Sequence, residues 1–241
     1  MTTRARSFDA AAALYHASRP GYPEALFDAV EELAGIPLRG ARVADAGAGT
    51  GIASALLHAR GARVLAVEPG DGMAAEFRRA HPAIPIVRGD GDRLPLATGA
   101  FDLLTYAQAW HWTDPARSVP EARRVLRPGG ALALWWNDLD PTVPWIAEQD
   151  ERIAELFGAP AGPQPRRTPD GLDLTTREVR WSRRIPLDAH LSNLASHSAF
   201  LLLGEPGTRE FVDAERARLR ARFPGGTVEE SYVVTLCVAV V

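Results

Sequence analysis

Short apolar runs alternate with amphipathic stretches through the first 136 residues of the chain. The apolar runs have the length of β-strands, and the stretches between them carry apolar residues at helical spacing. The predicted strands are residues 42–46, 63–67, 84–87, 102–106 and 131–136. The predicted helices between them are residues 52–60, 72–80 and 115–126. This alternation is typical of βαβ units and predicts a parallel sheet with helices on both faces.

Both ends of the chain depart from this alternation. Two short helices, residues 8–16 and 23–33, are predicted before the first strand, and the sequence RPGYP separates them. After Asn137 the predicted elements are a helix (141–157), a loop or lid rich in Pro and Gly (158–171), a strand (177–185), two helices (187–203 and 208–223) and a closing strand (231–241). The Pro/Gly loop is the only linker-like stretch and it is short, so we expect one domain that completes a single sheet.

The composition excludes several classes of protein. With 46% hydrophobic and 24% charged residues, the chain is typical of a soluble globular protein. Its single cysteine, Cys237, excludes an intrachain disulfide and a multi-cysteine metal site, and it fits a reducing compartment. All 27 basic residues are arginine, which excludes Schiff-base lysine chemistry and the lysine of a GxxxxGK[ST] loop.

Charge and hydropathy exclude further partners. A net charge of −3 supplies no general field for nucleic acid. No segment has about 18 consecutive apolar residues, and the N-terminal stretch lacks the apolar core of a signal peptide. We therefore expect a cytoplasmic protein with neither a membrane nor a nucleic acid as its partner.

The strongest motif is VADAGAGTG, residues 43–51. It places Asp45 at the end of the first predicted strand and three glycines in the turn that follows. Glycines there permit positive φ and let a ligand approach the backbone closely. A dinucleotide-binding GxGxxG motif would need its third glycine where this chain has Ile52. A carboxylate at Asp45 disfavours a pyrophosphate, whereas a sulfonium or ammonium group tolerates it.

Glu68 ends the second predicted strand, 17 residues after Gly51. An acid at this position is the usual device for binding both ribose hydroxyls of an adenosine-containing ligand. Together with the GxGxG spacing, Glu68 indicates an S-adenosylmethionine site. The alternative is a solvated carboxylate that precedes the Pro69–Gly70 turn.

Four motifs, in this order, resemble the class I S-adenosylmethionine-dependent methyltransferases, in the small-molecule group with the type 11 methyltransferase domain. They are VADAGAGTG, LAVEPGDGM (65–73), VRGDGDRLPLATGAFDLLTYAQAWHW (87–112) and EARRVLRPGGALALWW (121–136). The N-terminal LYHASRPGYP, with AQAWHW, is similar to the branch that includes trans-aconitate methyltransferase-like proteins. The resemblance implies an α/β fold: a Rossmann-like, doubly wound sheet of seven mostly parallel strands with helical cover over the active site. It also implies an antiparallel last strand and a sharp turn at LRPGG, residues 126–130.

The resemblance divides the chain into an N-terminal helical cover (1–36), a cofactor-binding core (37–136) and a part that completes the sheet and the acceptor pocket (137–241). In the core, the resemblance implies that Gly47 and Gly49 face the methionine part of S-adenosyl-L-methionine and that Asp45 lies near its ammonium group. In the cover, it implies that Tyr15 and Arg19 lie over the cofactor, where the guanidinium can pair with the cofactor's carboxylate. The alternative is that Arg19 is only a capping residue at the surface.

The adenosine end has its own implied residues. Glu68 holds the ribose, and Met73 packs near adenine and ribose, with plain core packing as its alternative. Asp90 accepts from the adenine amino group, and the backbone N–H of Gly91 donates to the ring. Most members have alanine at the position of Gly91, but a backbone contact survives that difference.

The AQAWHW segment, residues 107–112, follows the fourth predicted strand, where ligands bind in doubly wound sheets. We expect Gln108 to contact the methionine part of the cofactor. His111 is the catalytic candidate, either as a general base near neutral pH or as a group that orients the acceptor. A histidine that caps the following turn is the alternative. A candidate aromatic wall, part of which we expect to be core, is formed by Trp110, Trp112, Trp135, Trp136 and Trp145.

These observations predict methyl transfer from S-adenosyl-L-methionine to a small-molecule acceptor by in-line displacement, with no metal. We expect O-methylation, at a carboxylate or a hydroxyl. Two alternatives stay open: a nicotinamide- or nucleotide-binding oxidoreductase on a related fold, and a cofactor-binding protein that transfers no methyl group. The chain has no basic stripe and no [DNS]PP[YFW] motif after the fourth strand, which disfavours a nucleic-acid methyltransferase. The oligomeric state stays open.

Overall fold

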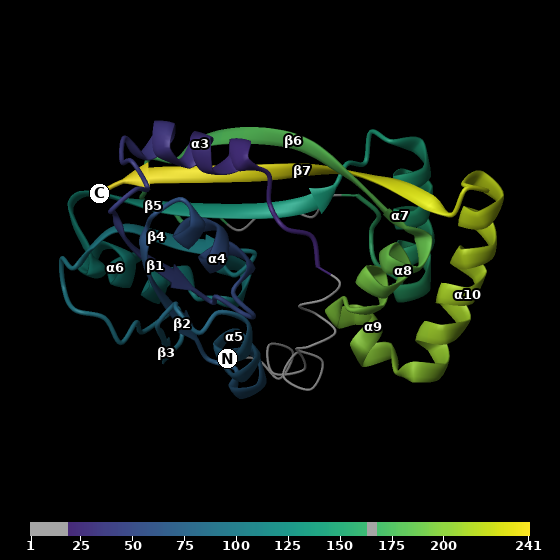
Figure 1. Ribbon diagram of the computed structural model, residues 1–241, viewed down its shortest axis with the longest axis horizontal. Helices are drawn as coiled ribbons and strands as arrows, with labels where there is room; N and C mark the ends of the chain where they lie inside the picture. The colour runs from purple at the N-terminus through teal and green to yellow at the C-terminus, as the bar shows by residue number, and fades with distance from the viewer. Residues whose placement is uncertain (1–18, 163–167) are drawn as a thin grey trace.

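The computed structural model describes residues 19–162 and 168–241, and the structural statements below concern these residues. Seven strands form one sheet in the order β3-β2-β1-β4-β5-β7-β6 (Figure 1). The strands are β1 (Arg42–Ala46), β2 (Arg63–Glu68), β3 (Ile86–Arg88), β4 (Phe101–Ala107), β5 (Leu126–Leu139), β6 (Thr175–Pro186) and β7 (Thr227–Val240). Strands β1 to β5 pair in parallel, and β7 runs antiparallel to β5 and β6. The predicted seven-stranded, mostly parallel sheet is confirmed.

Helices cover both faces of this sheet. The helices on these faces are α3 (Glu24–Ala34), α4 (Ile52–Ala59), α5 (Asp71–Ala80) and α6 (Pro115–Val125). The later helices are α7 (Pro144–Phe157), α8 (Leu187–Ala195), α9 (Ser198–Leu203) and α10 (Glu205–Arg222). Side chains alternate along β5, so Trp135 packs with α3, α4 and α5 on one face, while Trp136 packs with α6 on the other. No helix in the described ranges is long and apolar enough to cross a membrane. The predicted helix 8–16 and Tyr15 lie outside the described residues.

The three long strands β5, β6 and β7 reach beyond the others to a group of helices, α7 to α10 (Figure 1). In this group the predicted helix 187–203 is wrong, because it is two helices, α8 and α9. His197 leaves the helical region, with a ψ of 145°. Just before it, the Ser196 hydroxyl donates to the carbonyl oxygen of Asn193 at 2.6 Å. Such side-chain bonds to the backbone compete with helix continuation.

The segment 126–130 also differs from the prediction. Helix α6 ends at Val125, as expected, but the chain enters β5 at once instead of making a separate turn. Phe101 pairs with Leu126 and Leu103 with Ala131, so the extra residues of β5 form a bulge. Bulges of this kind bend a strand and increase its twist locally.

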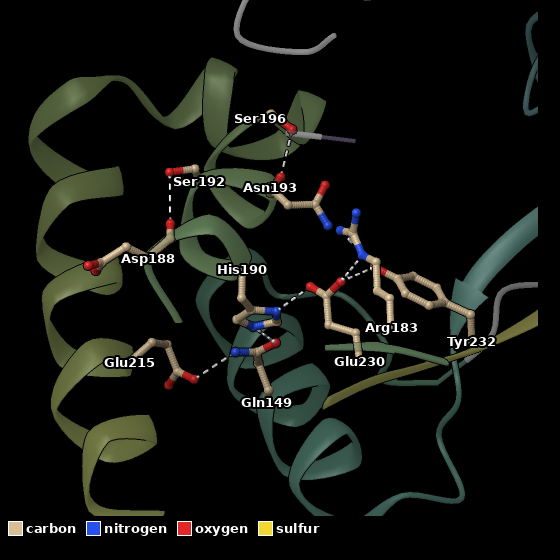
Figure 2. Close-up of polar contacts among 10 residues, drawn as sticks. All are labelled: Gln149, Arg183, Asp188, His190, Ser192, Asn193, Ser196, Glu215, Glu230 and Tyr232. Atoms are coloured by element: carbon tan, nitrogen blue, oxygen red, sulfur yellow. Dashed lines mark hydrogen bonds and ion pairs between the residues drawn. The ribbon is translucent and has the colours of Figure 1, made fainter. Parts of the chain in front are cut away.

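A buried polar network joins the long strands to the helices α7, α8 and α10 (Figure 2). The carboxylate of Glu230 accepts from Arg183 Nε at 2.6 Å and from the Tyr232 hydroxyl at 2.5 Å. Its other oxygen lies 2.6 Å from His190 Nδ1, and His190 Nε2 lies 3.1 Å from Gln149 Oε1. Although burial opposes ionisation of Glu230, the hydrogen bonds from His190 and Tyr232 hold its pKa below the usual value. The network therefore fixes the helices at one end of the sheet.

We expect Glu230→Ala to lower the free energy of unfolding by about 3–5 kcal/mol, because the change leaves Arg183 and His190 without their carboxylate. Urea titration followed by tryptophan fluorescence measures this loss. The control is Glu205→Gln, which removes an exposed ion pair with Arg209 and should leave stability unchanged. Equal stability of the two variants would contradict a structural role for the network.

Candidate active site

A cavity of about 790 Å³ lies at the carboxyl ends of β1, β2, β4 and β5. The structure brings nine of the eleven predicted site residues to its walls: Arg19, Gly47, Gly49, Glu68, Met73, Asp90, Gly91, Gln108 and His111. Of the other two, Tyr15 is outside the described residues and Asp45 lies beneath the cavity. Motifs that are far apart in the sequence thus meet at one place.

The glycine turn after β1 packs directly on the turn after β4. Gly47 has a φ of +69°, and a Cβ atom there would lie 2.6 Å from the Cβ of Ala109. Its backbone N–H donates to the carbonyl oxygen of Val67, at 2.9 Å, which ties the turn to β2. Only glycine fits this conformation and this approach. The predicted cofactor turn and the AQAWHW segment are therefore in contact.

Asp45 is fully buried below that turn. Its two carboxylate oxygens accept from the Ser54 hydroxyl at 2.6 Å and from the Thr105 hydroxyl at 2.8 Å. Burial raises the pKa of Asp45 to about 6, although these hydrogen bonds oppose the shift. The carboxylate does not line the cavity, which differs from the predicted place beside an ammonium group. Asp45 instead joins β1, α4 and β4 and supports the turn from below.

Glu68 lies at the cavity wall and is only 6% exposed, so the alternative of a solvated carboxylate is wrong. One carboxylate oxygen accepts from the backbone N–H of Gly49 at 2.8 Å, and the other accepts from that of Gly70 at 2.7 Å. These bonds orient the carboxylate between the glycine turn and the start of α5. A side chain oriented in this way loses little further freedom when a ligand binds.

Asp90 and Gly91 form the next part of the wall. The hydroxyl of Tyr106, a residue that sequence analysis missed, donates to the carbonyl oxygen of Gly91 at 2.9 Å. A Cβ atom at Gly91 would lie 2.8 Å from Tyr106 Cε1 and 2.9 Å from Thr113 Cγ2. Burial raises the pKa of Tyr106, so its hydroxyl stays a proton donor. Tyr106 therefore excludes alanine at position 91 and holds this strip of backbone in place.

Gln108 directly follows β4 in a strained conformation, with a φ of +56° that no other non-glycine residue of the described ranges shares. Its backbone N–H donates to the carbonyl oxygen of Trp135, and its Nε2 donates to that of Asn137, both at 2.9 Å. Strain of this kind costs about 1–3 kcal/mol and persists where the surroundings hold it. The two bonds tie the end of β4 to β5 within the cavity wall.

His111 is exposed and lies in the short 3-10 helix Trp110–Trp112, with its ring 4.7 Å from that of Trp112. The cap of the next helix, α6, is Asp114, whose carboxylate accepts from Ala116 N at 3.1 Å. Of the five tryptophans in the candidate aromatic wall, Trp112 lines the cavity, and the others belong to the core, as was expected for part of this set. The buried tryptophans are Trp110, Trp135, Trp136 and Trp145.

The far side of the cavity comes from the second half of the chain and was largely missed by sequence analysis. Asn137, Asn193, His197 and Tyr232 line this side, and Tyr22, which precedes α3, also lines the cavity. Burial, together with the nearby Arg19 cation, lowers the pKa of His197 to about 3. The imidazole of His197 is therefore neutral near pH 7 and adds no positive charge to the cavity.

The cavity is strongly acidic. Among the described residues, its walls carry two arginines, Arg19 and Arg180, and seven acids, which are Glu68, Asp90, Asp92, Asp138, Asp140, Asp150 and Glu178. Arg180 pairs with Asp140 at 2.6 Å and with Glu178 at 3.1 Å, so it leaves no excess of positive charge around it. In the described part of the chain, no three His, Cys, Asp or Glu residues are grouped as metal ligands would be.

Comparison with known proteins agrees with this geometry. Residues 44–134 match the family described as a methyltransferase domain. An uncharacterized methyltransferase of Mycobacterium bovis is 36% identical over 195 residues, which cover 80% of this chain and 76% of that protein. A demethylmenaquinone methyltransferase of Beutenbergia cavernae is 33% identical over 154 residues, covering 63% of this chain and 64% of that protein. A solved structure from Anaeromyxobacter dehalogenans, assigned as a type II methyltransferase, has a TM-score of 0.68 and 28% identity, over 92% of this chain and 97% of that one.

We expect Asp45→Asn to gain stability relative to the wild type as the pH rises. The folded protein holds the pKa of Asp45 near 6, above its value of about 4 in the unfolded chain. The contribution of Asp45 to stability is therefore full below about pH 4 and is lost as the pH approaches about 6. Urea titrations from pH 4 to pH 7 should show the difference between the two proteins changing by roughly 3 kcal/mol. A difference that is constant with pH would contradict this role.

Proposed function

Because this chain belongs to the class I S-adenosylmethionine-dependent methyltransferases, we propose that its cavity transfers a methyl group to a hydroxyl oxygen of a small molecule. The cofactor of this family is S-adenosyl-L-methionine. The observation that carries the proposal is the cavity itself, in which the predicted cofactor residues face an acidic wall from the second half of the chain. That wall belongs to the acceptor.

The lining residues fit the cofactor chemically. The carboxylate of Glu68, oriented by two backbone N–H groups, is suited to the ribose hydroxyls. Asp90 and Met73 offer an acceptor and an apolar surface for adenine. The turn at Gly47 permits close approach at the methionine end, where Arg19 is placed to pair with a carboxylate. Asp45 enters this proposal as the support of the turn and not as a direct ligand.

The charge of the cavity supports a hydroxyl over a carboxylate as the acceptor group. Seven acids and two arginines among the described lining residues repel an anionic acceptor. A cavity whose walls carry charge of one sign also attracts ligands of the opposite charge and repels ligands of the same charge. A neutral hydroxyl meets no such barrier, so of the two oxygen nucleophiles expected from the sequence we propose the hydroxyl.

The cofactor supplies an electrophilic methyl group on a sulfonium, which is already a good leaving group. The chain's contribution is to hold the acceptor oxygen in line with the methyl group and the sulfur, and to accept the proton of the acceptor hydroxyl. Positioning of this kind supplies up to about 7–11 kcal/mol. We assign the proton to a ring nitrogen of His111, which lies at the exposed rim of the cavity after β4. As the oxygen–carbon bond forms, the hydroxyl proton passes to this imidazole.

Other expectations from the sequence stay part of this proposal. They are the cytoplasmic location, the absence of a nucleic-acid partner and the division of one domain at residues 1–36, 37–136 and 137–241. The acidic cavity supports the second of these, because a phosphate backbone would be repelled by its walls.

Glu68→Gln should weaken binding of S-adenosylhomocysteine by about 10- to 100-fold, because it removes charge-assisted hydrogen bonds to the ribose while keeping the side chain's size. Titration calorimetry measures the dissociation constant, with Glu205→Gln as the control that changes an exposed glutamate elsewhere. Equal affinities for Glu68→Gln and the wild type would contradict the ribose assignment. Tight binding of NADH by the wild type would instead favour the oxidoreductase alternative.

His111→Ala should lower turnover by about 10²–10⁴-fold and leave the affinity for S-adenosylhomocysteine unchanged, because it removes the proton acceptor alone. Acceptors for this assay come from metabolite extracts incubated with labelled S-adenosylmethionine. His58→Ala, an exposed histidine on α4, is the matched control. A raised Michaelis constant with nearly unchanged turnover would assign His111 to orienting the acceptor instead.

A further inference from the structure

Asn137 lies in the cavity wall, near the end of β5, and is 7% exposed. Its side-chain oxygen accepts a hydrogen bond from Trp181 Nε1, at 3.0 Å. Its side-chain nitrogen, Nδ2, is buried and finds no hydrogen-bond partner among the described residues. A buried donor without a partner costs about 1–3 kcal/mol. A donor of this kind in a cavity wall indicates a ligand that accepts from it.

The orientation of this amide follows from its partner. An indole N–H only donates, so the amide atom that faces Trp181 is the oxygen, and the nitrogen points the other way. Trp181 is itself fixed, because its ring stacks on that of Tyr232 with centroids 4.9 Å apart. The Tyr232 hydroxyl in turn donates to Glu230 in the buried network (Figure 2). The unpartnered N–H group is therefore held in one direction by a rigid chain of contacts.

Asn137 lies beside the end of β4, where the proposed function requires methyl donor and acceptor to meet. Ala107, the last residue of β4, pairs with Trp135, so Asn137 lies two residues beyond the end of β4. The strained residue Gln108 donates to the backbone oxygen of Asn137 at 2.9 Å. Ends of adjacent parallel strands form the usual ligand site of such sheets.

We propose that Asn137 Nδ2 donates a hydrogen bond to an oxygen atom of the methyl acceptor and so positions the acceptor against the cofactor. The proposal rests on the proposed function and adds to it a chemical class. The acceptor presents a neutral oxygen, in a hydroxyl or a carbonyl group, at this point of the cavity. A carboxylate would also accept from Asn137, but it would face the acidic residues that line the cavity.

The kinetic test uses Asn137→Asp, which keeps the shape of the side chain and an oxygen for Trp181 but removes the N–H donor. Methyl transfer from labelled S-adenosylmethionine into a metabolite extract should fall about 10- to 100-fold in kcat/KM. The affinity for S-adenosylhomocysteine should not change. Full retention of transfer would overturn the proposal. An absence of transfer in the wild type itself would instead contradict the proposed function.

A second variant, Trp181→Phe, keeps a ring against Tyr232 but frees the amide of Asn137 to rotate. We expect it to raise KM for the acceptor several-fold and to leave the affinity for S-adenosylhomocysteine unchanged. An unchanged KM would contradict the idea that Trp181 fixes the donor.

A spectroscopic test needs no knowledge of the acceptor. The chain has two asparagines, Asn137 and Asn193, so labelling with ¹⁵N-asparagine gives two side-chain NH₂ signals, which Asn137→Asp assigns. The probes are benzamide and benzyl alcohol, with benzylammonium as the matched cation, added to protein saturated with S-adenosylhomocysteine. The neutral oxygen probes should shift the Asn137 signal more than benzylammonium does. A shift of the Asn193 signal with no shift at Asn137 would overturn the proposal.

Discussion

The close contact between Gly47 and Ala109 is the constraint on which the rest of the site depends. A single methyl group at Gly47 would lie 2.6 Å from the Ala109 side chain. The turns after β1 and β4 can therefore touch only because position 47 is a glycine. This contact places the residues that hold the cofactor beside the residues that lead to the acceptor. Asp45 supports it from beneath by joining β1, α4 and β4 through Ser54 and Thr105.

Next to that contact, the backbone at the end of β4 is also constrained. Gln108 adopts its positive φ because the backbone and side chain both bond to β5. The side chain of Gln108 donates to the backbone oxygen of Asn137. The side-chain amide of Asn137 is fixed by Trp181, whose ring stacks on Tyr232. The Tyr232 hydroxyl in turn donates to Glu230 in the buried network. The helices α7, α8 and α10 thus form more than a cover, because the network that fixes them also fixes one wall of the cavity.

Sequence patterns predicted the sheet, the glycine turn and Glu68 because those features are local: apolar periodicity, positive φ and an acid at a strand end. They misplaced Asp45, since only the fold brings Thr105 and Ser54 to its carboxylate. Tyr106 and Trp181 were missed for the same reason, because each acts through a hydrogen bond to a residue distant in sequence.

Other features of the site had a weaker local signal. Asn137 directly follows the predicted fifth strand, so the rule that ligands bind at the carboxyl ends of parallel strands could have indicated it. His197 had no such signal, because the helix break that exposes it to the cavity depends on Ser196 bonding to the backbone. The acidic character of the acceptor wall likewise could not be predicted from the net charge of the chain, which is only −3.

A crystal structure of the protein with S-adenosylhomocysteine tests directly whether the turns after β1 and β4 hold the cofactor beside the acceptor wall. The ribose hydroxyls should lie within hydrogen-bond distance of the Glu68 carboxylate, with the adenine beside Met73 and the sulfur facing the end of β4. The far wall at Asn137 should stay open to a second ligand. A cofactor that binds elsewhere, or that occupies the space beside Asn137 while leaving Glu68 without a ribose contact, would contradict this arrangement.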